Sequence, residues 1–109
     1  MNEQVRKHIE KYPSEIIDIY NSLRELIFDN APSAPTEMLW ARIPSYYVGS
    51  KFIRLIPFGD HVNVEASAIL SHSEELKGYK ITPKGMLQIY LKQRIPSEIL
   101  SEVFAETLK

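Results

Sequence analysis

The sequence predicts an α+β protein in which two long helices cover one face of an antiparallel sheet. Apolar residues recur with helical spacing over residues 14–28 and again over residues 97–108. Between these segments lie short runs in which apolar and polar residues alternate, each bounded by Pro or Gly, as is typical of strands joined by hairpins. The expected architecture is therefore a two-layer sandwich of helix, antiparallel sheet and helix, with the second face of the sheet left open.

Length and composition limit the function. With 109 residues the chain suits one domain spanning residues 1–109, and its 44% hydrophobic and 25% charged content is average for a globular protein. The absence of cysteine excludes disulfides, thiolate catalysis and zinc fingers. A net charge of −1 offers no basic surplus for nucleic acid, and no apolar run is long enough to span a membrane. The N-terminal residues lack the apolar core of a signal peptide, so we expect a cytoplasmic protein.

The two long helices have recognisable ends. The first is expected over Ser14–Phe28, because Pro13 suits the first turn of a helix and the turn-forming run from Asp29 to Pro32 ends it. The second begins at Pro96. Acidic residues follow its outer face at intervals of four: Glu98, Glu102 and Glu106.

Shorter helical segments are expected on either side of this frame. Ser67 can cap a helix over Ala68–Lys77, and Gly78 can end it. Near the N-terminus, Val5 and Ile9 indicate one further helical turn beside the first long helix.

Four alternating runs are expected to form the strands, with a tight hairpin turn at Phe58–His61: Met38–Ile43, Lys51–Phe58, His61–Glu65 and Met86–Leu91. Their alternation sorts the side chains onto two faces. An aliphatic face is expected under the helices: Leu39, Ala41, Ile43, Ile53, Leu55, Val62, Val64, Leu87 and Ile89. A polar and aromatic face is expected to stay open: Trp40, Arg42, Arg54, His61, Asn63, Glu65, Gln88 and Tyr90.

Several short motifs follow one another along the chain: Pro13-Ser14-Glu15, Leu23-Arg24-Glu25-Leu26-Ile27, Ile43-Pro44-Ser45-Tyr46, His61-Val62-Asn63-Val64, Leu76-Lys77-Gly78-Tyr79-Lys80, Lys84-Gly85 and Ile95-Pro96. In this order, from about Val5 to Leu108, they resemble the YdhG-like family of small bacterial proteins with a frataxin-like fold. The resemblance implies a frataxin-like sandwich and an intracellular iron chaperone that delivers Fe(II) for iron–sulfur cluster or haem assembly. Two positions depart from the family pattern, because Gly59-Asp60 precedes His61 where a basic residue is frequent, and Ala41 stands where tyrosine is usual.

An acidic stripe on the first long helix is the candidate metal site. At about 100° per residue, its four carboxylates fall within an arc of roughly 80° beside the apolar face: Glu15, Asp18, Glu25 and Asp29. Carboxylate oxygens suit iron as well as Mn, Mg or Ca, and frataxin-like proteins are thought to hold iron on this helix. The alternative is a solvated helix face. Acidic residues near a helix N-terminus stabilise the helix, which accounts for Glu15 and Asp18 but not for Glu25 and Asp29.

The open face is the candidate partner-binding surface: Trp40, Arg42, His61, Asn63, Gln88 and Tyr90. Trp, Tyr and Arg are enriched at binding hot spots. Trp40 is either exposed for a partner or covered by the N-terminal segment or a loop as part of the core. His61 and Glu65 lie roughly 13 Å apart along one strand and cannot share a metal, so His61 is either a surface histidine or part of a site with a neighbouring element.

Catalysis has little support, because the chain has no nucleophile elbow, no His-Glu-x-x-His motif and no phosphate-binding glycine loop. We therefore expect a binding protein and not an enzyme. The first hypothesis is an iron chaperone that binds Fe(II) weakly and contacts iron–sulfur cluster or haem assembly proteins. The alternative is a binding module without a metal, whose Trp40 face contacts a protein, a small ligand or a second copy in a homodimer. An enzyme of unrecognised type is the third class.

Overall fold

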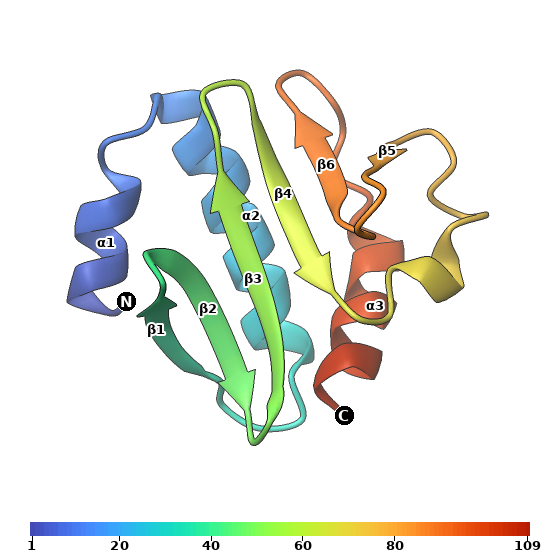
Figure 1. Ribbon diagram of the computed structural model, residues 1–109, viewed down its shortest axis with the longest axis horizontal. Coiled ribbons are helices and arrows are strands. Elements are labelled where there is room, and N and C mark those ends of the chain that lie inside the picture. The colour runs from blue at the N-terminus through green and yellow to red at the C-terminus, as the bar shows by residue number, and fades with distance from the viewer.

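Two long helices lie behind a six-stranded antiparallel sheet, and the front of the sheet carries no helix (Figure 1). The computed structural model describes all 109 residues. Its helices and strands are α1 Glu3–Ile9, α2 Ser14–Asn30, β1 Thr36–Trp40, β2 Ile43–Val48, β3 Lys51–Pro57, β4 His61–Ala66, the short 3₁₀ helix η1 Leu70–His72, β5 Lys80–Ile81, β6 Leu87–Tyr90 and α3 Ser97–Leu108. The strand order is β1-β2-β3-β4-β6-β5. The α+β class with an antiparallel sheet is confirmed. None of the helices combines the length and the apolar character that crossing a membrane requires.

The hydrophobic core lies between the sheet and the two long helices. On α2 the buried residues are Ile16, Tyr20, Leu23 and Ile27, which form the predicted stripe. The strand residues predicted to face the helices are fully buried on β3, β4 and β6: Ile53, Leu55, Val62, Val64, Leu87 and Ile89. The hairpin at residues 58–61 is also confirmed, since the Phe58 N–H donates to the His61 carbonyl at 2.8 Å.

The run Met38–Ile43 is not one strand, and the prediction for its second half is wrong. Ala41 and Arg42 form a two-residue turn at φ 49° and 65°, and Trp40 pairs with Ile43 across it. Ala41 is exposed and not in the core, and Ile43 shares the open face with its partner Trp40. The alternating pattern gave the wrong prediction because two-residue hairpin turns of this kind usually contain Asn-Gly, and Ala-Arg does not indicate one.

This turn provides a first testable prediction. Both of its residues adopt the left-handed conformation, which is costly for residues that carry a Cβ. The double substitution Ala41→Asn, Arg42→Gly is therefore expected to raise the free energy of unfolding by about 1 kcal/mol. Urea denaturation measures it. A loss of stability would contradict the left-handed turn.

The helix predicted at Ala68–Lys77 is absent apart from the single turn η1, and Ser67 does not cap it. The segment instead uses tight bonds between residues three apart, such as His72 N–H to Ile69 carbonyl at 3.0 Å. Ser71 Oγ also donates to the Ala68 carbonyl at 2.8 Å, a local bond that competes with helix. The chain therefore runs as a compact loop.

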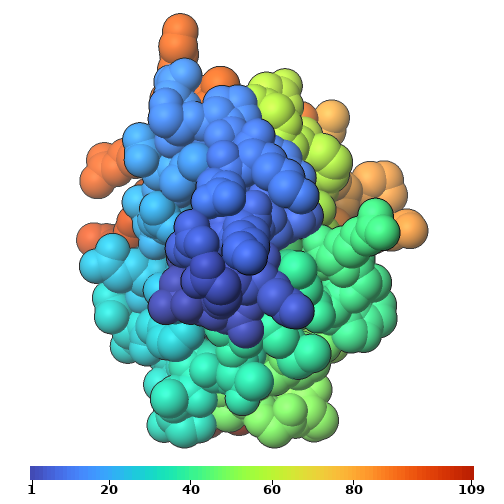
Figure 2. All heavy atoms as spheres, turned by 90° about the vertical axis from the view of Figure 1, so that its left-hand side faces the viewer, coloured from blue at the N-terminus to red at the C-terminus, as the bar shows by residue number.

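The N-terminal residues form the helix α1, which extends the single turn expected there. In the side view of Figure 2, α1 covers the surface between α2 and the β1–β2 hairpin. Val5 and Ile9 are buried in the core. The Asn2 amide Nδ2 donates to the Glu37 carbonyl at 3.2 Å, which ties α1 to the edge strand β1.

A buried polar network lies under this edge of the sheet. The Tyr20 and Tyr46 hydroxyls share a short hydrogen bond in the core, and burial raises the pKa of both phenols. The Glu37 carboxylate, only 6% exposed, accepts from Arg24 Nε at 2.5 Å and from the Asn2 backbone N–H at 2.6 Å. Burial alone raises the pKa of Glu37, but these hydrogen bonds outweigh it and leave that pKa lowered. The network therefore holds an ionised carboxylate in place.

Candidate functional site

The open face of the sheet is organised around Arg54. The pairing of strands sets Met38, Ser45, Arg54 and Glu65 side by side across β1 to β4. Because directly paired residues share a face, all four side chains project from the open side. Trp40 belongs to the next position along β1 on the same face.

The Arg54 guanidinium is held between two aromatic rings. Its central carbon lies 4.0 Å from the centre of the Trp40 ring and 3.9 Å from that of Phe52. Its Nε donates to Ser45 Oγ at 3.2 Å, and its Nη2 donates to the Tyr47 hydroxyl at 3.1 Å. We call this group the Arg54 cluster: Arg54 with Trp40, Ser45, Tyr47, Phe52 and Glu65, whose Oε1 lies 3.6 Å from Arg54 Nη1.

Trp40 is exposed and not part of the core. It is 49% exposed, and its neighbour Met38 is 40% exposed. The stacked guanidinium orients the indole while leaving its other face to solvent. An oriented aromatic side chain loses little conformational entropy when a partner covers it.

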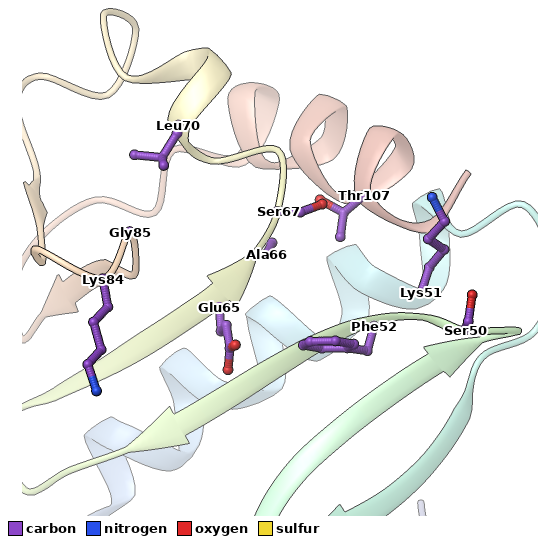
Figure 3. Close-up of a pocket in the computed structure, with 10 residues that line it drawn as sticks. All are labelled: Ser50, Lys51, Phe52, Glu65, Ala66, Ser67, Leu70, Lys84, Gly85 and Thr107. Atoms are coloured by element: carbon purple, nitrogen blue, oxygen red, sulfur yellow. The ribbon is translucent and has the colours of Figure 1, made fainter.

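A pocket of about 420 Å³ adjoins the Arg54 cluster where β4 ends (Figure 3). Phe52 and Glu65 lie next to each other on neighbouring strands and belong to both the pocket and the cluster. The remaining walls come from the β2–β3 turn, the end of β4, η1, the β5–β6 loop and α3: Ser50, Lys51, Ala66, Ser67, Leu70, Lys84, Gly85 and Thr107. Gly85 has φ 89°, and a Cβ there would lie 3.4 Å from Leu70 Cδ1, so the β5–β6 loop closes directly against η1.

Positive charge borders this pocket. Lys51 and Lys84 stand on opposite sides of it in Figure 3, and both are exposed and form no ion pair. The one carboxylate in the lining, Glu65, already faces Arg54. The pocket therefore favours an acidic group over a basic one.

His61 lies at the other end of the open face. Its ring is stacked between Phe58, at 4.5 Å between ring centres, and Tyr90, at 4.6 Å. Nδ1 lies 2.7 Å from Asp60 Oδ1, and the Tyr90 hydroxyl donates to Gln88 Oε1 at 3.2 Å. These contacts give His61 a packing role in the β3–β4 turn.

The six predicted partner-binding residues thus form two groups. Trp40 is on β1 and Arg42 in the exposed turn after it, so the prediction that Arg42 lies on the sheet face is wrong. A separate group occupies β4 and β6: His61, Asn63, Gln88 and Tyr90. Strands lie about 4.8 Å apart, which separates β1 from β4 by about 14 Å. Asn63 is buried, with its Nδ2 3.8 Å from Met86 Sδ.

The four acidic residues of α2 are exposed and form no ion pair: Glu15, Asp18, Glu25 and Asp29. Glu15 and Asp18 border a shallow hollow that Lys92 and Gln93 also line. These carboxylates do not converge on one point, because the chain's single group of three potential ligands within 4.8 Å of one another lies elsewhere.

That group is centred on His72, which sequence patterns did not single out. The hydrogen bond with Glu106, followed in size of effect by the one with Glu75, raises the pKa of the imidazole. Glu106 is 34 residues away in the chain, so no local spacing announces the contact. The central place of Arg54 was missed for a similar reason, since its two aromatic neighbours come from different strands.

Comparisons with known proteins provide no relative to set beside this geometry. No protein-family model matches the chain, no curated protein matches it, and no solved structure matches it. The resemblance to YdhG-like proteins therefore stays a prediction from the sequence, and the function has to be inferred from the site itself.

Proposed function

We propose that this protein is a small binding protein, not an enzyme, that docks onto a protein partner through the open face of its sheet. The observation that carries the proposal is the half-exposed Trp40, stacked on a guanidinium that is itself fixed by hydrogen bonds. Tryptophan and arginine dominate binding hot spots, and a rigid anchor reduces the entropic cost of docking.

The pocket beside the Arg54 cluster supports the same role. A segment of the partner that covers Trp40 can place a side chain against Phe52 in this pocket. With Lys51 and Lys84 on either side, an acidic side chain is favoured there. The partner surface is therefore expected to combine an apolar contact with negative charge.

The second part of the proposal concerns the cargo. The resemblance of the sequence to YdhG-like proteins favours an iron chaperone that delivers Fe(II) to iron–sulfur cluster or haem assembly proteins, and two helices on one face of an antiparallel sheet are compatible with it. The exposed, unpaired carboxylates of α2 suit weak, reversible binding, which a chaperone needs in order to release its metal.

Docking and metal carriage are separable by mutation. Trp40→Ala is expected to weaken binding to a purified cluster-assembly scaffold protein at least tenfold, about 1.4 kcal/mol, and to leave Fe(II) binding unchanged. The quadruple variant of α2, with Gln for Glu15 and Glu25 and Asn for Asp18 and Asp29, is expected to lose Fe(II) binding along α2 and to leave docking unchanged. Calorimetry measures the docking.

Anaerobic titration of Fe(II) into isotope-labelled protein, followed by NMR with Mg(II) as the control, measures the metal. Selective broadening along α2 supports the chaperone hypothesis, and indiscriminate broadening removes it. If Trp40→Ala instead abolishes a concentration-dependent dimer in sedimentation experiments, the open face serves self-association, which is the alternative function.

A further inference from the structure

The loop between β4 and β5 meets the C-terminal half of α3 through one histidine and three glutamates. We call them the His72 cluster: His72, Glu75, Glu102 and Glu106. His72 belongs to η1, and Glu75 follows it by three residues. Glu102 and Glu106 lie one turn apart on α3 and so face the same way.

The imidazole is fixed at both ring nitrogens. Nδ1 lies 2.7 Å from Glu75 Oε1, and Nε2 forms a short hydrogen bond with Glu106. The His72 side chain is only 14% exposed, whereas Glu75 and Glu106 are about half exposed. The ring therefore stands in a defined orientation with carboxylates around it.

The distances between these side chains suit a shared metal ion. One candidate ligand atom from each of His72, Glu75 and Glu102 lies within 4.8 Å of the other two. Metal–ligand distances of about 2.0–2.2 Å place neighbouring ligand atoms about 3–4 Å apart, so small side-chain rotations complete the geometry. No other group of three histidine or acidic side chains in the chain meets this distance.

The charge of the cluster is unbalanced. Three carboxylates surround one imidazole, and no lysine or arginine pairs with any of them. Glu102 forms neither a hydrogen bond nor an ion pair, although it lies within reach of the ring. An excess of negative charge next to a nitrogen donor favours a bound dication.

We propose that the His72 cluster binds one first-row transition-metal dication through His72 Nδ1, Glu75 and Glu102, with Glu106 accepting a hydrogen bond from Nε2–H. A ring nitrogen that donates to a carboxylate fixes the tautomer of a metal-bound histidine. The mixed nitrogen and oxygen ligands select zinc, cobalt or iron over magnesium and calcium, which prefer oxygen alone. This site shares no residue with the Arg54 cluster or with the acidic residues of α2.

The test is a titration of chelator-treated protein with Co(II), read by its visible absorption, and with Zn(II), read by calorimetry, with Mg(II) as the control. We expect one Co(II) per chain and paramagnetic broadening confined to residues near His72 and Glu102. Glu102→Gln removes a ligand that supports no other contact, so the fold stays intact while affinity falls at least tenfold. Glu98→Gln, one turn away on the same helix, is the matched control and should bind as the parent does.

His72→Gln and its control His8→Gln provide the second comparison, with folding checked by NMR. Loss of Co(II) binding in His72→Gln but not in His8→Gln supports the site. Equal affinities for the parent and Glu102→Gln, or Mg(II) competition at equal concentration, overturn it. Neither result bears on docking through Trp40, which is measured separately.

Discussion

Replacing Glu37 by Gln is expected to lower the free energy of unfolding by about 3 kcal/mol, because it leaves part of a buried charge network without its partner. The Glu37 carboxylate accepts from Arg24 and from the Asn2 backbone N–H while only 6% exposed. An amide can accept one of these hydrogen bonds but cannot balance the guanidinium charge. Urea denaturation at neutral pH measures the loss. Glu25→Gln on the exposed side of α2 is the matched control and should change stability by less than about 0.5 kcal/mol.

The same residue sets a pH dependence with a defined sign. The pKa of Glu37 is lower in the folded protein than its ordinary value of 4.5, so its contribution is fully present above that pH. The contribution is lost as the pH falls through the folded-state pKa. The difference in stability between the parent and Glu37→Gln should therefore shrink in acid. A difference that stays constant between pH 7 and pH 3 would exclude an ionised Glu37.

Arg54→Ala is expected to cost about 2 kcal/mol of stability and to release Trp40. The substitution removes two hydrogen bonds, the contact with Glu65 and the cation between two aromatic rings. Because Trp40 is the only tryptophan, its fluorescence reports on this cluster alone. We expect a red-shifted emission and a lower anisotropy.

Arg54→Lys tests what the guanidinium contributes beyond its charge. Lysine keeps the positive charge but lacks the flat, forked group that fits between Trp40 and Phe52. It is expected to retain part of the stability and little of the Trp40 orientation. Parent-like anisotropy in Arg54→Lys would show that charge alone holds the indole.

The parts of the fold with a regular hydrophobic pattern could be predicted from the sequence. The stripe from Ile16 to Ile27 located α2, and alternation on β3, β4 and β6 predicted which side chains meet the helices. The prediction was wrong where the residue types fit more than one local conformation. Ala41 and Arg42 are ordinary strand residues by composition, yet they adopt left-handed conformations. Ser71 Oγ donates to the Ala68 carbonyl, a local bond that competes with the helix predicted after Ser67.

The candidate sites were harder to predict, because they depend on contacts between distant parts of the chain. The open position of Trp40 was one of two alternatives, and only the packing around it decides between them. His72 meets Glu106 across 34 residues, which no spacing rule anticipates. Local pattern predicts faces, whereas sites require the three-dimensional neighbours of each side chain.

The position of α1 along β1 has a consequence for how the molecule meets others. The Asn2 side chain donates a hydrogen bond to the Glu37 carbonyl of the edge strand β1. The opposite edge of the sheet ends in β5, a strand of two residues. Neither edge presents a long row of free backbone groups on which another chain could add a strand. Contacts through the open face rely on side chains instead, so their specificity depends on surface composition and not on backbone pairing. Such a sheet is also protected from the strand-to-strand growth that leads to aggregates.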